Sequence, residues 1–442
     1  MAPRMARKLA FDVTHLASRL PIETPSGIDK VDLAFAEYLT ERADILVHYG
    51  LRKPRFHSPA GLASLTHAGS ARWGSHKNYG DDAWAQLSSF LAGSEKPIPV
   101  APVAMGLLDG GRSIAPVVKR KRRVQQNGWR FSRSQVLLPE NAIYLNVAQF
   151  AFEYERFFRW LPERPDLMPV FMVHDLLPLD YPEYFRPGYK QRFTQRTRTI
   201  LTHAKAVLAA SAYVKERLER AYSEQARAAA VPIHVTALPS SLPPPDDRFT
   251  HLPELADTSY FVVLGTIEPR KNHLLLLNIW RRMAEQQSTA GRPSPAVPKL
   301  IIVGSRGWEN EQVVDILDRS ALVRPHVLEI SNLDDARLAV LIANARGLLF
   351  PSFAEGYGLP LVEALSLKTP VIASDIPVFR EVSQGCALFA SPLDGPRWLN
   401  LVQALSDPAG EQAISARHQA RTFVPPTWTG YFESVQGFLS TL

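Results

Sequence analysis

Four charged residues in the second half of the sequence have the types and spacing to bind a phosphorylated sugar. Arg270 and Lys271 are adjacent in EPRKN, and Glu355 and Glu363 stand with seven residues between them in SFAEGYGLPLVEAL. An arginine can donate to two phosphate oxygens and a lysine adds a compact charge, so the pair could offset the charge on a departing diphosphate. Carboxylates accept from hydroxyl groups, which suits Glu363 to a ribose and Glu355 to a sugar ring. Solvated loop cations and a helix N-terminal charge at Glu363 are the alternatives.

The loop that follows Glu355 is suited to close approach of a ligand. Two glycines flank a tyrosine there, and they allow backbone amides near a ligand without an intervening Cβ. Pro360 fits the first turn of the helix that carries Glu363. The residues expected to contact the nucleotide here are Gly356, Tyr357, Gly358 and Leu359.

Short apolar runs from residue 259 onward alternate with amphipathic stretches, which is the pattern of a parallel sheet covered by helices. The runs YFVVLGTI, KLIIVGS, RGLLFPS and PVIAS are each followed by a helical stretch. Ligands of such sheets bind at the carboxyl ends of the strands. The loops TIEPRK, SRGWE and SFAEGYG should therefore line one crevice.

The first half has the same order of elements with a weaker pattern. KLAFDVTHL is expected to be a strand, Gly27 to lie in the next turn, and MPVFMVHDLLPL to be a strand that ends near His174; Ser211 should cap a helix. Residues 52–140 have no sustained period and are expected to be an acceptor-side insertion or a mobile loop. The Pro-, Ser- and Asp-rich segment at 242–257 predicts a linker.

Composition limits the class of protein. With 442 residues, 46% hydrophobic and 21% charged, the chain is expected to be soluble and to form two domains. No run approaches the roughly 18 to 20 apolar residues of a membrane-spanning helix. Cys386 is the single cysteine, which excludes an intrachain disulfide and a cysteine metal cluster and fits a reducing compartment. We therefore expect a cytoplasmic protein.

The net charge of +7 and the pI near 9.4 favour an acidic partner, which could be nucleic acid, anionic lipid or a phosphorylated substrate. No helix carries a basic face with base-reading residues, so nucleic acid is not expected. The basic run at 119–123 is either a solvated loop or a membrane-surface patch, worth about 1 kcal/mol per basic residue near anionic lipid. In the second case the protein would contact the inner face of the cytoplasmic membrane.

The motifs EPRKN, PSFAEGYGLPLVEAL and TPVIASDIPVFREV together closely resemble the donor domain of the family 4 retaining glycosyltransferases. The resemblance is specific over roughly residues 259–385 and weaker in the first half. It implies the GT-B fold, an α/β architecture of two doubly wound, Rossmann-like domains that face a central cleft. The implied parts are an acceptor domain over 1–245 with an insertion at about 52–140, a donor domain over 246–425, and a terminal helix over 426–442 that crosses back.

The resemblance also implies the roles of individual residues. The first glutamate of the motif, Glu355, would contact the donor sugar, and Glu363 would bind the ribose. Arg270 and Lys271 would bind the diphosphate, and His174 would line the cleft near the transferred sugar. On composition alone, the alternative for His174 is a core or strand-end histidine without a role in binding. Transfer in this family retains the anomeric configuration and needs no metal and no cofactor.

Two further residues follow from the same resemblance. PSGIDKV is similar to the flexible glycine loop after the first strand, which brings Gly27 near the phosphates, although this chain has one glycine where some relatives have two. SRGWEN stands where the family holds the nucleotide base. There Arg306 is either a base or phosphate contact or a structural residue.

The expected activity is transfer of a hexose or deoxyhexose from a nucleotide diphosphate-sugar to a saccharide or lipid-linked saccharide in cell-surface polysaccharide synthesis. Mannosyl or rhamnosyl transfer is favoured slightly, and the base and acceptor stay open. A non-catalytic sugar-nucleotide-binding protein of the same fold is the alternative. A nicotinamide dehydrogenase is disfavoured because neither LGTIEP nor VGSRGW supplies G-x-G-x-x-G at a strand–helix junction.

Overall fold

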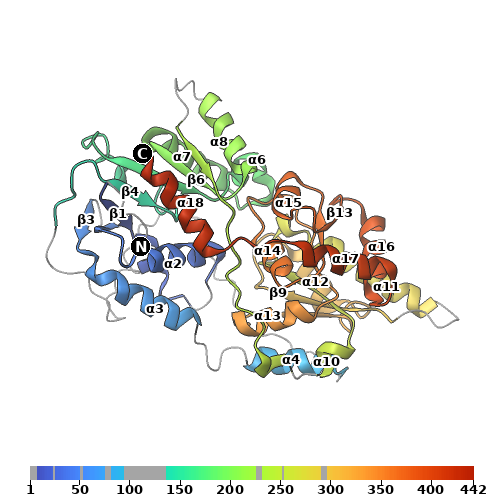
Figure 1. Cartoon of the computed structure of the whole chain (residues 1–442). Coiled ribbons are helices and arrows are strands. Elements are labelled where there is room, and N and C mark those ends of the chain that lie inside the picture. Colours follow the sequence, from blue (N-terminus) through green and yellow to red (C-terminus); the bar gives the residue numbers. More distant parts are fainter. Residues whose placement is uncertain are drawn as a thin grey trace.

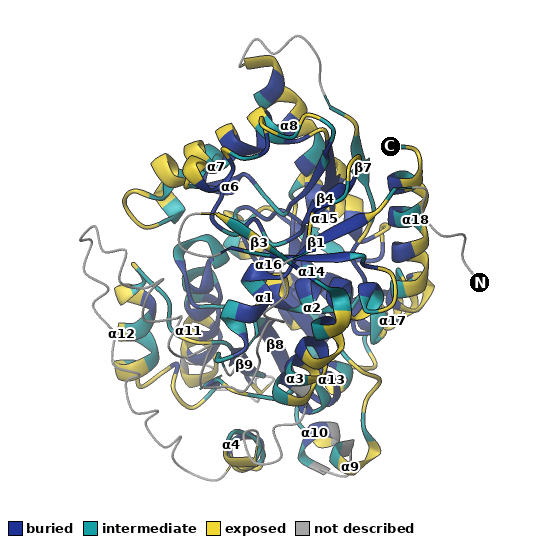
Figure 2. Cartoon of the chain, turned by 90° about the vertical axis from the view of Figure 1, so that its left-hand side faces the viewer, coloured by how far each residue is buried: buried dark blue, intermediate teal, exposed yellow. Residues whose placement is uncertain are grey.

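The computed structural model describes residues 7–22, 25–49, 53–74, 81–93, 136–224, 231–250, 253–289 and 296–442. The basic run at 119–123 lies outside these residues, as does much of the expected insertion at 52–140. Two α/β halves lie side by side, each with a sheet at its centre (Figure 1). The inner strands of both sheets are buried, and most exposed residues lie on the helices and loops around them (Figure 2).

The sheet of the N-terminal half has the order β3-β2-β1-β4-β5-β6-β7 in the described residues. Its pairs are parallel except β2 with β3, which are antiparallel at the edge. The strands are β1 (Leu9–Asp12), β2 (Ile45–Tyr49), β3 (Pro54–His57), β4 (Ile143–Asn146), β5 (Met168–Val173), β6 (Ala206–Ala209) and β7 (Ile233–Val235). Their near-continuous apolar runs are what a sheet covered on both faces requires.

Helices and short 3-10 turns connect these strands. They are α1 (Thr14–Arg19), α2 (Gly27–Leu39), η1 (Pro59–Gly61), α3 (Leu62–Gly74), α4 (Asp81–Leu91), η2 (Glu155–Phe157), α6 (Leu177–Asp180), η3 (Pro182–Tyr184), α7 (Tyr189–His203) and α8 (Ala212–Glu224). The expected strand KLAFDVTHL is shorter than predicted. The Asp12 carboxylate accepts from the backbone N–H of Thr14 at 2.9 Å and from its hydroxyl at 2.6 Å, and this local turn ends β1 and starts α1.

The sheet of the C-terminal half is parallel, with the order β10-β9-β8-β11-β12-β13. Its strands are β8 (Tyr260–Leu264), β9 (Lys299–Val303), β10 (Val327–Ile330), β11 (Gly347–Phe350), β12 (Val371–Ser374) and β13 (Leu388–Ala390). Its helices are α9 (Asp247–Thr250), α10 (Pro253–Asp257), η4 (Pro269–Lys271), α11 (His273–Thr289), α12 (Glu311–Arg319), α13 (Asp335–Asn344), α14 (Leu359–Ser366), α15 (Pro377–Val382), α16 (Gly395–Ser406), α17 (Glu411–Thr422) and α18 (Trp428–Ser440). The two doubly wound halves confirm the predicted GT-B class.

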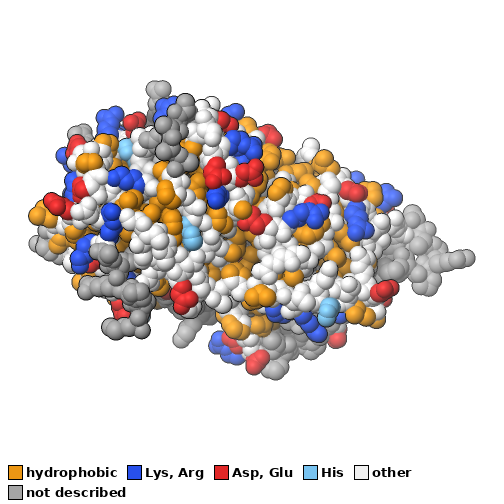
Figure 3. Space-filling model, turned by 45° about the horizontal axis from the view of Figure 1, so that its top comes forward, with side chains coloured by type: hydrophobic (Ala, Val, Ile, Leu, Met, Phe, Trp, Pro, Cys, Tyr) orange, Lys and Arg blue, Asp and Glu red, His pale blue; other side chains and the backbone are white. Residues whose placement is uncertain are grey.

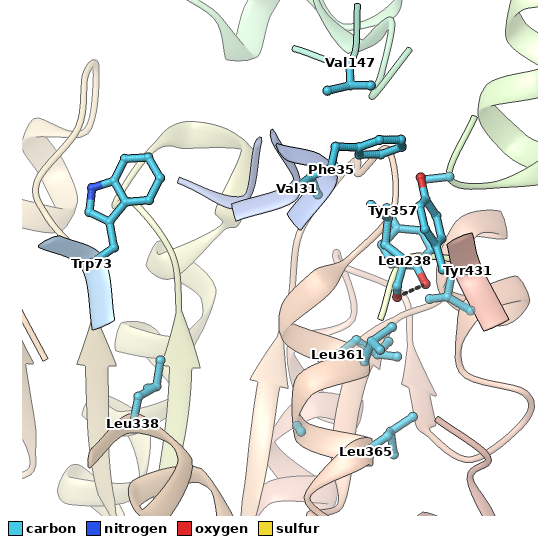
Figure 4. Close-up of a cluster of buried hydrophobic side chains, with 14 of the residues drawn as sticks. Val31, Phe35, Trp73, Val147, Leu238, Leu338, Tyr357, Leu361, Leu365 and Tyr431 are labelled. Carbon is cyan, nitrogen blue, oxygen red and sulfur yellow. Dashed lines mark hydrogen bonds between the residues drawn. The ribbon is translucent and has the colours of Figure 1, made fainter. Parts of the chain in front are cut away.

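The last helix, α18, packs on the N-terminal half (Figure 1). The rings of Tyr38 in α2 and Phe432 in α18 stack with centroids 4.1 Å apart, and the Tyr38 hydroxyl donates to Gln436 at 2.5 Å. Figure 4 shows Tyr431 of α18 beside Tyr357 and Leu238, below Phe35 of α2. Buried apolar side chains thus continue from one half into the other.

Helix α4 departs from the expected division of the chain. It belongs to the segment at 52–140, for which the sequence analysis expected an acceptor-side insertion or a mobile loop, yet it packs beneath the C-terminal half beside α10 (Figure 1). Leu87, Phe90 and Leu91 are buried in one cluster with Leu328 and Ile330 of β10. The reason is amphipathicity: α4 needs an apolar partner for these side chains, and the edge of the second sheet supplies one.

The described surface carries charges of both signs. On the face in Figure 3, basic and acidic side chains are interspersed among apolar ones. Of the helices that the structure describes, none combines the length and apolarity needed to cross a membrane.

Candidate active site

The loop that carries Arg270 and Lys271 is fixed by its neighbours at the carboxyl end of β8. Gly265 has φ 133° and donates its N–H to the carbonyl of Val303 at 3.0 Å. A Cβ on Gly304 would lie 2.0 Å from the carbonyl oxygen of Gly265, so the loops after β8 and β9 fit together only with glycine there. The turn η4 then presents both cations at the strand ends, as predicted.

Arg270, Lys271 and Glu355 form one buried cluster of charges. Arg270 Nη1 lies 2.6 Å from Glu355 Oε2, and Lys271 Nζ lies 2.7 Å from Glu355 Oε1. The Arg270 guanidinium also pairs with Glu268 at 2.6 Å and donates to the carbonyl of Ala354 at 2.9 Å. The structure therefore brings together the three residues that the sequence analysis expected at the diphosphate and the sugar.

The cluster keeps Glu355 ionised. Burial by itself would raise the pKa of Glu355, but the charges of Arg270 and Lys271 outweigh it and lower the pKa to about 2. Burial lowers the pKa of Lys271, and Glu355 opposes that shift. Glu268 shows the reverse balance, because burial raises its pKa against the effect of Arg270. Two cations thus stand in a poorly hydrated place, where a bound anion would interact strongly with them.

Three close contacts join the loop after Glu355 and the start of α14 to the N-terminal half. A Cβ on Gly356 would lie 2.5 Å from the carbonyl oxygen of His174, so the loop after Glu355 lies directly on the end of β5. The carbonyl of Gly356 accepts from the hydroxyl of Ser211 at 2.8 Å. A Cβ on Gly27 would lie 2.9 Å from Cδ1 of Leu359. Residues predicted from separate motifs therefore pack directly against each other where the two halves meet.

His174 is held as a neutral imidazole. Its Nε2 lies 2.7 Å from the carbonyl oxygen of Val147, which can only accept, so Nε2 carries the proton and Nδ1 keeps a lone pair. Burial lowers the pKa of His174 to about 4. Burial raises the pKa of the adjacent Asp175, and the charge of Arg270 opposes this shift without cancelling it. The Asp175 carboxyl therefore interacts electrostatically with the cluster.

Glu363 lies in α14 and has a different environment from Glu355. Its Oε1 accepts from the hydroxyl of Ser241 at 3.3 Å, and burial raises its pKa. Ser241 also lines a pocket of about 250 Å³ between the halves. Lys30 and Asp335, joined by an ion pair of 2.8 Å across the cleft, form another part of its wall. The second glutamate of the motif is therefore buried beside a pocket of mixed polar and apolar lining, apart from the Arg270 cluster.

Arg306 is engaged outside the cluster. Its guanidinium pairs with Asp318 at 2.6 Å and with Glu329 at 2.8 Å, and these carboxylates raise its pKa. Its backbone forms an isolated parallel bridge with Ile267, in the loop that leads to Arg270. Of the two roles left open by the sequence, the structural one matches these contacts.

Tyr357 and Gly358 shape the start of α14. The Tyr357 hydroxyl donates to the carbonyl of Leu238 at 2.7 Å (Figure 4). Gly358 has φ 114°, and a Cβ there would lie 2.8 Å from the ring of Phe379, so position 358 requires glycine. The Tyr357 side chain therefore binds the segment that connects the two halves.

Sequence reasoning missed three residues that complete the site. Glu268 lies in the TIEPRK loop, two residues before Arg270, and this short spacing is the pattern that could have predicted their ion pair. Ser241 lies in the linker and Glu381 in α15, and neither has a local pattern that reveals its partner. The Glu381 carboxylate accepts from the N–H of Ala212 at 2.6 Å and thereby caps α8 from the other half. Within the described residues, no three His, Cys, Asp or Glu side chains are grouped to hold a metal.

Comparison with known proteins agrees with this geometry. The family model described as glycosyl transferases group 1 matches residues 247–384. The serotype-specific mannosyltransferase WbdA of Escherichia coli is 32% identical over 264 residues, which cover 54% of this chain and 31% of WbdA. The O-antigen chain mannosyltransferase B of Escherichia coli is 27% identical, over 59% of this chain and 67% of that protein. The chain thus spans less than a third of WbdA's length.

A solved structure resembles the whole molecule. The crystal structure of HepE from Anabaena in complex with UDP and glucose has a TM-score of 0.60, at 15% sequence identity, covering 99% of this chain and 100% of HepE. At that identity the likeness concerns the fold. Both halves and their connection therefore have a GT-B counterpart, and residues 247–384, which carry Arg270, Lys271, Glu355 and Glu363, are a glycosyltransferase group 1 domain.

Proposed function

We propose that this protein is a retaining glycosyltransferase that moves a hexose from a nucleotide diphosphate-sugar to a saccharide hydroxyl. The observation that carries the proposal is the buried cluster of Arg270, Lys271 and Glu355, which lies at the strand ends of the group 1 domain and against the backbone of His174. The same cations would also serve a protein that only binds a sugar nucleotide, so support for catalysis comes from the relatives, which are named as mannosyltransferases.

In the proposed reaction the acceptor oxygen forms a bond to the anomeric carbon while the bond from that carbon to the diphosphate breaks. The acceptor proton passes to an oxygen of the leaving diphosphate, so no protein base is required. Arg270 and Lys271 stabilise the charge that grows on the diphosphate. Glu355 orients the sugar through its hydroxyls, and the lone pair on Nδ1 of His174 accepts from a hydroxyl near the reacting carbon.

The donor is proposed to lie along the cleft from the Arg270 cluster to the pocket beside Glu363. In this arrangement Glu363 exchanges its bond to Ser241 for the ribose hydroxyls, and the base enters the pocket lined by Lys30 and Asp335. Two relatives are named as mannosyltransferases, one of them of the O-antigen chain, which favours mannose as the sugar and a cell-surface polysaccharide as the acceptor. The alternative sugar from the sequence is rhamnose.

The decisive experiment is a panel of nucleotide sugars, read both by thermal shift and by release of nucleoside diphosphate with an oligosaccharide acceptor. A true donor raises the unfolding temperature by mass action and yields product. A panel with no shift and no product would overturn the proposal. Binding without product for every acceptor tried would favour the alternative, a non-catalytic sugar-nucleotide-binding protein.

Two finer parts of the proposal have tests of their own. The reaction is proposed to need no metal, so EDTA should leave turnover intact; loss that a divalent cation restores would contradict this. Peripheral contact with the inner face of a cytoplasmic membrane is proposed from the net charge of +7 and the basic run at 119–123. Flotation with vesicles containing phosphatidylglycerol, compared with purely zwitterionic vesicles, checks that contact.

A further inference from the structure

Three aromatic residues and an arginine join the two halves at the loops that carry the charged cluster. The rings of Tyr184 in η3 and Phe353 lie stacked, with centroids 5.2 Å apart and an interplanar angle of 9°. The indole N–H of Trp308 donates to the carbonyl of Tyr184 at 3.3 Å. The guanidinium of Arg186 lies over the Trp308 ring at 5.2 Å. We call these four residues the aromatic clasp.

The clasp is attached to the donor loops through their backbones. The N–H of Phe353 donates to the carbonyl of Arg270 at 2.9 Å, and Phe353 lies two residues before Glu355. Trp308 follows Gly307, whose N–H donates to the carbonyl of Ile267 at 2.9 Å. A Cβ on Gly307 would lie 2.7 Å from that carbonyl oxygen. The clasp therefore acts on both loops of the charged cluster.

The other side of the clasp comes from the segment that follows His174. Tyr184 and Arg186 lie in the connection from β5 to α7, which starts at His174 and Asp175. All four residues of the clasp are partly or fully exposed, and the Tyr184 ring also stacks on Tyr181 of its own segment, with centroids 6.1 Å apart. The buried apolar cluster shared by the two halves includes Phe35, Tyr357 and Tyr431 but none of the clasp residues, so the clasp is a separate contact at the donor loops. A few specific contacts at this place would thus set how long the cleft stays closed.

We propose that the aromatic clasp decides whether the activated sugar goes to the acceptor or to water. This inference rests on the proposed glycosyltransferase function. Closure of the cleft expels water from the sugar and from the Arg270 cluster. When the clasp is weakened, water enters, its oxygen forms the bond to the anomeric carbon, the bond to the diphosphate breaks, and the released proton goes to the diphosphate or the buffer. Tyr184, Arg186 and Trp308 are positioning residues in this scheme.

The test measures two products from the same reaction, free sugar and elongated acceptor, for the wild type and for Tyr184→Ala, Tyr184→Phe, Trp308→Phe and Arg186→Ala. Loss of one aromatic stack should raise the ratio of hydrolysis to transfer roughly 2- to 10-fold in Tyr184→Ala. Arg186→Ala should raise it about 2-fold. Tyr184→Phe retains the stack and the backbone acceptor for Trp308, so its ratio should equal that of the wild type.

A matched control removes an aromatic contact between two other elements that are also far apart in the chain. Trp84 of α4 meets Phe249 of α9 edge to face at 5.9 Å, away from the donor loops. Trp84→Ala should lower the unfolding temperature and leave the ratio unchanged. The inference is overturned if Tyr184→Ala keeps the wild-type ratio. Should that variant fail to fold, unchanged ratios in both Arg186→Ala and Trp308→Phe overturn it. A wild type inactive with all nucleotide sugars would instead refute the proposed function.

Discussion

The two glutamates of one motif occupy opposite electrostatic environments. Glu355 lies between Arg270 and Lys271, and its pKa falls to about 2. Glu363 is equally buried but has the Ser241 hydroxyl as its hydrogen-bond partner, and its pKa rises. Burial opposes ionisation in both places, and only the cations reverse it. The charged end of the cleft is thus organised in advance, whereas the Glu363 end is arranged for a neutral, hydroxyl-rich partner.

Removal of both cations should have the largest effect on turnover. Arg270→Ala with Lys271→Ala deletes the charges that the proposed reaction places at the departing diphosphate, and kcat should fall at least 10²- to 10³-fold, about 2.7 to 4 kcal/mol in the barrier. Steady-state release of nucleoside diphosphate measures it. The matched control is Arg281→Ala with Arg282→Ala, which deletes two adjacent cations from the exposed face of α11. Equal turnover in both double variants would refute the comparison.

The two glutamates should give opposite pH dependence of stability. The folded-state pKa of Glu355 lies below its ordinary value of 4.5, so its stabilisation is present above pH 4.5 and is lost as the pH falls to about 2. The advantage of wild type over Glu355→Gln should shrink over that range by roughly 3 kcal/mol. The folded-state pKa of Glu363 is raised, so its contribution is present below pH 4.5 and lost as the pH rises.

Urea unfolding of wild type, Glu355→Gln and Glu363→Gln across this pH range measures how each glutamate changes the free energy of unfolding with pH. Relative to the wild type, Glu363→Gln should gain stability as the pH rises above 4.5. If the free energy of unfolding depended on pH in the same way for both variants, the two carboxyls would have similar folded-state pKa values. The cations would then not account for a difference between Glu355 and Glu363.

Glu363→Gln should affect donor binding more than the chemical step. A carboxylate that accepts from hydroxyl groups contributes about 1.5 to 3 kcal/mol, and an amide keeps one acceptor, so the donor KM should rise roughly tenfold with kcat little changed. Initial rates against donor concentration separate the two parameters. A fall in kcat at unchanged KM would indicate that Glu363 acts on the chemical step, as proposed for Arg270, and not on donor binding.

Arg306→Ala should have the smallest effect. The side chain is 30% exposed and pairs with Asp318 and Glu329, so its loss should lower the free energy of unfolding by about 1 kcal/mol and leave the kinetics unchanged. Thermal unfolding and the donor KM are the two measurements. A tenfold rise in the donor KM would instead support the other role that the sequence left open for Arg306, contact with the nucleotide base.

The sequence predicted the second half better than the first for a physical reason. Regular alternation of strands and helices determines where strand ends lie, and so the approach of Arg270 to Glu355 follows from the pattern. The pairing of Glu363 with Ser241 joins elements far apart in the chain and has no local signature. The same holds for Glu381 at the start of α8. The packing of helix α4 was not predicted because its apolar face lies against the other half of the molecule, a contact that leaves no local signal in the sequence.

The position of α4 has a practical consequence for protein production. A C-terminal half expressed alone from residue 246 would lack α4, and the apolar side chains of Leu328 and Ile330 in β10 would lose a cover supplied by Phe90 and its neighbours. Exposed apolar patches next to an edge strand promote aggregation. A soluble fragment would therefore need residues 81–93, supplied as a fused or an added peptide. The affinity of the added peptide for the fragment would then measure the strength of the contact between α4 and the C-terminal half.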